Sequence, residues 1–171
     1  MIFDGYWKWE LEKLFRSISI WCKLPIFNGL TEHRLNRAVL YSAIILRKCL
    51  EDEMEAEKVS KEDAIVLPKF PLLNAKLQAT CFPYVDDDGW FFRGKICTSD
   101  YGKGEAVTLS LQFICNQLVH SYVWGGARST RNKRFVGFLV ASDRDKEKHV
   151  HFVSFEEWCK MLKFCIQQGA F

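Results

Sequence analysis

The chain has 171 residues, of which 49% are hydrophobic and 26% are charged, and its formal net charge is +3. These values predict a single globular domain, residues 1–171, with a sizeable core. The small net charge does not by itself indicate a nucleic-acid partner, and no apolar run reaches the roughly 18 residues that a membrane span needs.

Two amphipathic helices are predicted in the first third of the chain. Apolar residues recur at i, i+3, i+4 and i+7 from Tyr6 to Lys23, which lies shortly before a proline. A second such stripe follows Thr31, and we expect this helix to continue through a charged run to Lys58. Between Asp63 and Asp88 three prolines exclude a long helix, so this part is predicted to be a traverse with short extended pieces.

The second half of the chain is predicted to hold the centre of the fold. From Thr108 to Trp124 the apolar residues cover nearly the whole helical circumference, which is typical of a helix buried in a bundle. Alternating runs predict a small antiparallel sheet, and a capping box formed by Ser154 and Glu157 opens a last helix. The three strands are expected at residues 90–98, 134–142 and 149–154. The predicted fold class is therefore α+β and predominantly helical, with a four-helix bundle-like core and a small three-stranded antiparallel sheet.

Two polar residues, Asn116 and His120, stand out on the predicted central helix. They are four residues apart and therefore share one face of that helix. A buried amide or imidazole without a partner costs about 1–3 kcal/mol. The sequence leaves two alternatives open: the two side chains hold the core together, or they line a site.

Other chemistries have less support in the sequence. Cys115 and His120 point in different directions on a helix and do not form a thiol–imidazole pair. His149 and His151 share a strand face, but without a nearby carboxylate or cysteine motif they are interpreted as strand side chains and not as metal ligands. Because the phosphate-binding glycine motifs are also missing, the sequence predicts no metal and no cofactor.

A basic segment, GGARSTRNKR, follows the predicted central helix. It holds four cations with no acidic residue between them, and these are Arg128, Arg131, Lys133 and Arg134. Such a cluster suits contact with nucleic-acid phosphates, and the alternative interpretation is a solvated loop. These cations would allow nucleic-acid binding without cleavage or, together with His120 as a proton carrier, metal-independent RNA cleavage.

The string CNQLVH at residues 115–120 resembles the helical motif of HEPN-type domains, in which an arginine and a polar residue precede a histidine. Asn116 takes the polar position and His120 the histidine position, whereas Cys115 stands where the family has its catalytic arginine. The tract HRLNRAVLYSAIILRKCLED, with Arg47 and Lys48, is similar to a helix of uncharacterised bacterial proteins that carry a CN-x-x-x-H-S string. The resemblance implies a homodimeric, RNA- or nucleotide-binding domain with a degenerate metal-independent RNase motif, in which His120 and Asn116 are the catalytic residues.

A second hypothesis is a non-enzymatic interaction module, or a partner component of a bacterial defence or regulatory system. The cysteine at position 115 favours it, and Trp7 and Trp9 on the first helix would support it if they were exposed. Seven cysteines without CxxC spacing, and a start without a basic and apolar leader, predict a reduced, cytoplasmic protein with no membrane partner.

Overall fold

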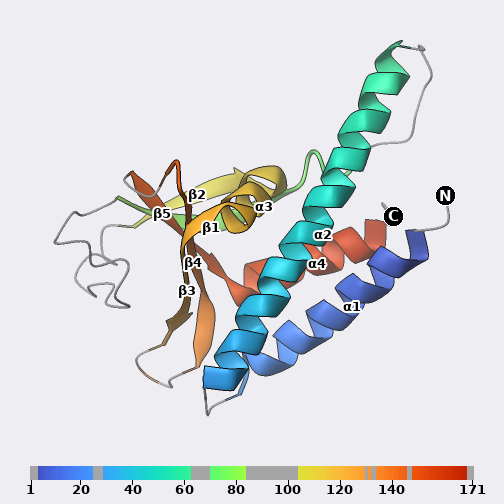
Figure 1. The fold of residues 1–171 in the computed structure, drawn as a ribbon. Coiled ribbons are helices and arrows are strands. Elements are labelled where there is room, and N and C mark those ends of the chain that lie inside the picture. The colour runs from blue at the N-terminus through green and yellow to red at the C-terminus, as the bar shows by residue number, and fades with distance from the viewer. Residues whose placement is uncertain are drawn as a thin grey trace.

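The computed structural model describes residues 4–24, 29–62, 70–83, 104–129, 131, 134–145 and 148–168. Four helices and five strands lie in these ranges (Figure 1). In chain order they are α1 (Asp4–Trp21), α2 (Gly29–Glu62), β1 (Lys76–Pro83), β2 (Glu105–Ser110), α3 (Leu111–Val119), β3 (Ser121–Arg128), β4 (Phe135–Ser142), β5 (His149–Ser154) and α4 (Phe155–Gln168).

The strands form one antiparallel sheet in the order β2-β1-β5-β4-β3. β1 is paired on both sides, with Ala79 opposite Val107 of β2 and Thr80 opposite Phe152 of β5. Because β5 returns between β1 and β4, the strands β2 and β3 lie at opposite edges of the sheet. Helix α3 connects these two edges, and this crossing brings it beside α2 (Figure 1).

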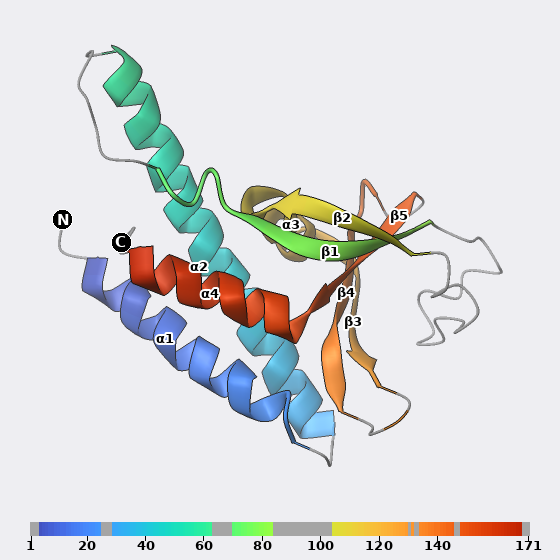
Figure 2. The ribbon, with the colours of Figure 1, turned by 180° about the vertical axis from the view of Figure 1, so that it is seen from behind.

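The main core combines side chains of all four helices with side chains of the sheet, and α1 packs against both α2 and α4 (Figure 2). Trp158 of α4 is fully buried in this core, and its indole N–H donates a hydrogen bond to Ser42 Oγ of α2 at 3.1 Å. The Ser42 hydroxyl in turn donates to the carbonyl of Val39 at 2.8 Å. A buried polar group without a partner costs about 1–3 kcal/mol, so this chain of bonds allows the indole to be buried and ties α4 to α2.

Several predicted elements are present in the structure. α1 and α2 correspond to the two N-terminal helices, and α2 continues beyond its expected end to Glu62. β4 and β5 form the predicted hairpin, with Val140 opposite His151. At the start of α4, Ser154 Oγ accepts a hydrogen bond from the Glu157 N–H at 3.1 Å, which is the hydroxyl half of the predicted capping box.

The predicted fold class is wrong about the sheet and about the central helix. The structure has a five-stranded antiparallel sheet in place of a three-stranded one beside a four-helix bundle core. Residues 108–124 are not one helix, because β2 ends at Ser110, α3 covers only Leu111–Val119, and β3 follows. The apolar pattern looked continuous because it joined a short helix to parts of two strands. β-branched and aromatic residues such as Val123 and Trp124 favour extended backbone, which agrees with their position in β3.

Strand β1 is one of the short extended pieces predicted between Asp63 and Asp88, and the structure shows that it belongs to the sheet. Leu77 and Ala79 are buried whereas Lys76 and Gln78 are exposed, which is the period of two that a half-buried strand requires. Prolines at both ends of the segment obscured this short alternation.

The basic segment is likewise not a loop throughout, because Gly125–Arg128 belong to β3. The strand predicted at residues 90–98 lies outside the described residues. Among the helices of the described ranges, none combines the length and the hydropathy that a membrane crossing requires.

Candidate functional site

Helix α3 positions the residues that the sequence singled out. Ser110 caps its N-terminus, because Ser110 Oγ accepts a hydrogen bond from the Phe113 N–H at 3.2 Å. His120 is its C-cap, and the His120 N–H donates to the Asn116 carbonyl at 3.0 Å. Four apolar residues of α3 are buried in the main core, and these are Leu111, Ile114, Cys115 and Leu118. The helix therefore ends with the His120 side chain exposed at its junction with α2.

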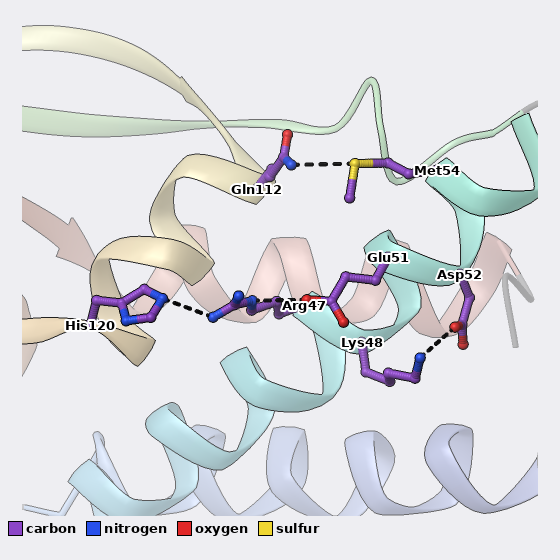
Figure 3. A network of polar contacts seen from close by, with 7 residues as sticks. All are labelled: Arg47, Lys48, Glu51, Asp52, Met54, Gln112 and His120. Carbon is purple, nitrogen blue, oxygen red and sulfur yellow. Dashed lines mark hydrogen bonds and ion pairs between the residues drawn. The ribbon is translucent and has the colours of Figure 1, made fainter. Parts of the chain in front are cut away.

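The imidazole of His120 meets the guanidinium of Arg47, which comes from α2. Arg47 Nη1 lies 3.0 Å from His120 Nε2 (Figure 3). A guanidinium has no acceptor, so Nε2 accepts this hydrogen bond and the imidazole in this arrangement is the neutral tautomer with its proton on Nδ1. A lone pair of His120 and a fixed positive charge are thus held side by side.

Glu51 orients the guanidinium of Arg47. Arg47 Nε donates to Glu51 Oε1 at 3.1 Å, one turn further along α2 (Figure 3). The neighbouring Lys48 is paired in the same way with Asp52 at 2.8 Å. Exposed i,i+4 pairs of this kind stabilise a helix by only a few tenths of a kcal/mol. Their consequence here is geometric, because the side chain of Arg47 is held toward α3 while a third of it stays open to solvent.

Gln117 fixes the C-terminal end of α3 to the sheet. Its side chain is buried; Oε1 accepts a hydrogen bond from the Ser142 N–H at 2.6 Å and Nε2 donates to Asp145 Oδ2. Asp145 also accepts from Ser142 Oγ at 3.1 Å. These donors lower the pKa of the Asp145 carboxyl below its ordinary value, the bond from Gln117 having the largest effect. A further bond, from the Asp143 N–H to the His120 carbonyl at 3.2 Å, holds the residue that carries the imidazole.

The three residues of the HEPN-like string lie in different environments. His120 is exposed, Asn116 is partly exposed, and Cys115 is fully buried. The Cys115 thiol is buried away from solvent, and this burial raises its pKa, so the thiol stays protonated. The position at which the family has its arginine therefore offers no cation, but Arg47 brings one to the same histidine from another helix.

The predicted basic residues gather elsewhere, at the far end of β3. Arg128 pairs with Glu32 near the start of α2 at 3.0 Å, and its guanidinium lies 4.8 Å from the centre of the Phe135 ring. Arg131 and Arg134 are exposed, and Lys133 lies outside the described residues. At about 3.3 Å per residue, the eight residues of β3 span about 26 Å. The structure therefore does not bring Arg128 and Arg131 to His120.

A second histidine of interest, His151 on β5, is buried beneath α3. Its ring meets Phe113 edge-on with the ring centres 5.2 Å apart, and its Nδ1 has no hydrogen-bond partner in the described part of the chain. Burial lowers the pKa of His151, and the neighbouring His149 lowers it further, while Asp145 opposes the shift. Within the described residues, no three His, Cys, Asp or Glu side chains come together as a potential metal site.

No model of a known protein family matches this chain, and neither a curated protein nor a solved structure does. The function of this protein is therefore inferred from its own residues. Two of the residues that build the site were not identified from the sequence as parts of it. The Arg47 tract was noted only as similar to a helix of other proteins, and Gln117 lay inside the motif string without an assigned role.

Proposed function

We propose that this protein binds RNA at the Arg47–His120 pair and cleaves it there without a metal ion. The observation that carries the proposal is the 3.0 Å contact between Arg47 Nη1 and His120 Nε2 at the surface. Phosphodiester cleavage by the neighbouring 2′-hydroxyl needs one group that accepts a proton and one fixed cation that stabilises charge on the phosphate. An exposed neutral imidazole beside an oriented guanidinium supplies both.

In the proposed reaction, an RNA phosphate takes the place of His120 Nε2 as the acceptor for Arg47. His120 Nε2 then accepts the proton of the 2′-hydroxyl while the 2′-oxygen attacks phosphorus. The bond from phosphorus to the 5′-oxygen breaks, that oxygen takes a proton from solvent water, and the protonated His120 returns its proton to solvent. The products are a 2′,3′-cyclic phosphate and a free 5′-hydroxyl. Asn116, which is one turn from His120 on α3, is proposed to contact the bound nucleotide.

The proposal is tested by incubating the protein in EDTA with a single-stranded RNA and with DNA of the same sequence. The RNA should be cut and the DNA should stay intact, because the reaction uses the 2′-hydroxyl. The upstream RNA product should end in a 2′,3′-cyclic phosphate. His120→Ala should lower the rate by about 10²–10⁴-fold, the usual contribution of general acid–base catalysis. Because the His120 side chain is exposed, the free energy of unfolding of the His120→Ala variant should differ from that of wild type by less than about 1 kcal/mol.

The matched control is Lys61→Ala. Lys61 lies on the same helix and also has an i,i+4 ion pair, with Glu57 at 2.8 Å, but it is far from His120 along α2. This variant should keep the full cleavage rate. Equal cleavage by wild type and His120→Ala would mean that the activity does not belong to this site.

A second candidate function is self-association as a homodimer through α1. Tyr6 and Trp9 are 50% and 55% exposed, and Lys13 lies over the Trp9 ring at 5.0 Å, whereas Trp7 is packed against the main core. Large exposed aromatic side chains are favoured at protein interfaces. Light scattering should give a dimeric mass that Trp9→Ser converts to a monomeric one, and a monomeric wild type at tens of micromolar would exclude the dimer.

We also propose that the protein works in a reducing compartment, the cytoplasm. The six cysteines of the described part of the chain are all free thiols. Burial raises the pKa of Cys49 and of Cys165 to about 12, which keeps these thiols protonated and unreactive. Titration of the native protein with a thiol reagent should leave these two cysteines unmodified until the protein unfolds.

A further inference from the structure

The surface of α2 between Glu32 and Glu51 is basic, and its first half is not used by the cleavage chemistry. From His33 to Leu50 the helix has no acidic residue, and it has four cations, which are Arg34, Arg37, Arg47 and Lys48. Arg47 and Lys48 are paired with carboxylates one turn further on. Arg34 and Arg37 are exposed, and in the described part of the chain neither has an ion-pair partner. Positive charge is therefore left over in the first half of α2.

Apolar side chains are exposed on the same face of α2. Leu40 and Ile44 are 38% and 45% exposed, and they follow His33 and Arg37 at the i+3 and i+4 spacing that places residues on one helix face. The buried stripe of α2 lies on the other side of the helix, where α4 packs (Figure 2). This outer face of α2, defined by His33, Arg37, Leu40 and Ile44, thus mixes cations with accessible apolar surface.

The outer face of α2 connects the two functional clusters of the molecule. β3 lies beside the first half of α2, with the Arg47–His120 pair at one end and the Arg128–Glu32 pair at the other (Figure 1). At about 1.5 Å per residue, Glu32 and Arg47 are about 22 Å apart along α2. Arg131, which is exposed, follows Arg128 in the turn after β3, so cations occur at both ends of this face and along it.

We propose that the outer face of α2 is the binding surface for single-stranded RNA, which extends from the Arg128 end to the Arg47–His120 pair. This inference rests on the proposed function, because it supplies the path of the strand that is cut. The cations match the repeated charge of the phosphates. Leu40 and Ile44 lie between the cations, where they contact unpaired bases. A duplex hides its base faces in the stack and would leave these two side chains against phosphates, so the surface fits a single strand.

The proposal is tested by measuring the affinity for a single-stranded RNA of about ten nucleotides, a length within the range of single-strand binding sites. A duplex of the same sequence is measured beside it. Wild type should prefer the single strand. Arg34 lies beside the outer face, three residues before Arg37. Arg34→Ala combined with Arg37→Ala should therefore weaken binding by at least about tenfold at low salt and reduce the salt dependence, because two cations within reach of the phosphates are lost. Ile44→Ser should weaken binding to the single strand with little change in the salt dependence.

The control variant combines Lys58→Ala with Lys61→Ala, which removes the same charge from exposed positions at the other end of α2. Its affinity should stay within about twofold of wild type. Thermal unfolding of each variant checks that it is folded, as expected for exposed positions away from the core. A loss of affinity equal to that of the arginine variant would mean that only net charge matters, and would overturn the proposal.

Cleavage of a dinucleotide separates this inference from the proposed function, because so short a substrate reaches only the Arg47–His120 pair. If the dinucleotide is cut but the Arg34 and Arg37 double variant binds the longer RNA normally, the path along α2 is wrong while the site stands. Equal affinity for the duplex, or tighter binding of polyglutamate than of RNA, would also overturn the single-strand proposal. The second result would indicate an acidic protein as the partner of this surface.

Discussion

Replacing the buried amide of Gln117 should loosen the junction between α3 and the sheet that carries His120. In Gln117→Leu, the N–H of Ser142, itself a buried residue, loses its acceptor, which costs about 1–3 kcal/mol. Asp145 loses one donor to its carboxylate, and such bonds contribute about 1.5–3 kcal/mol. Because Asp145 is partly exposed, water replaces part of the second contribution. We therefore expect a total loss of about 2–4 kcal/mol at neutral pH.

Gln117→Glu provides the matched comparison. The introduced carboxylate still accepts from the Ser142 N–H, but it faces the carboxylate of Asp145. Repulsion raises the folded-state pKa of the introduced carboxyl above its unfolded value, so its contribution to stability is present at low pH and is lost as pH rises through the folded pKa. The protonated carboxyl can donate to Asp145 as the amide does. Relative to wild type, this variant should recover stability as pH falls from about 7 toward 5, whereas Gln117→Leu should not.

Urea denaturation across this pH range measures both effects, and each kcal/mol should also move the thermal midpoint by about 2–4 °C for a domain of this size. In wild type, the lowered pKa of Asp145 contributes stability above its ordinary pKa of 3.8 that is lost as pH falls below that value. A Gln117→Leu variant within about 0.5 kcal/mol of wild type would refute the reasoning. So would a Gln117→Glu variant whose stability followed the wild-type pH dependence.

Three further predictions concern packing and buried charge. Burial lowers the pKa of His151 below 6.5, so the unfolded chain binds a proton at this histidine at higher pH than the folded protein does. The free energy of unfolding of wild type should therefore fall as pH drops below about 6.5, and His151→Leu should reduce this pH dependence in urea titrations. An unchanged pH dependence would contradict the prediction. The buried carboxylate of Glu53 accepts a hydrogen bond from the Leu72 N–H at 3.0 Å. Glu53→Leu should therefore lower the free energy of unfolding by about 1–3 kcal/mol, and Glu53→Gln, which keeps an acceptor, should lower it by less. Equal losses in the two variants would argue against this bond. A Cβ at Gly137 would lie 2.3 Å from the Val153 carbonyl oxygen, so Gly137→Ala should lower the free energy of unfolding by at least about 1–3 kcal/mol and lower the thermal midpoint accordingly. An unchanged midpoint would show that β4 can shift to make room.

The sequence predicted those helices whose apolar residues repeat over several turns. α1 and α2 have such stripes, and Ser154 marks the start of α4 through the bond that its hydroxyl makes. The strands on either side of α3 were not recognised, because two short strands and a nine-residue helix follow one another without a glycine or proline between them. Apolar residues in three adjoining elements then resembled a single buried helix. The burial that distinguishes them depends on pairing with β1 and β4, which local sequence does not encode.

The sequence singled out one of the two residues that make up the candidate site. Two polar residues at one-turn spacing, Asn116 and His120, stood out in the sequence, which left open whether they are buried or line a site. The structure places His120 at the C-cap of α3 with its side chain exposed. Its partner, Arg47, could not be predicted from the sequence, because it is 73 positions away and comes close only where α3 crosses beside α2. The nearest cations in the chain, such as Arg128, are carried away by β3, since an extended strand advances about twice as far per residue as a helix does.

The central claim is that Arg47 and His120 act on RNA as one unit. It is tested most directly by the single-turnover rate of RNA cleavage in EDTA for wild type, Arg47→Ala, His120→Ala and the double variant. Groups that act as a unit give strongly non-additive losses, so each single variant should lose about as much rate as the double variant does. A double variant whose loss is the product of the two single losses, or a wild type that leaves RNA intact, would contradict the account.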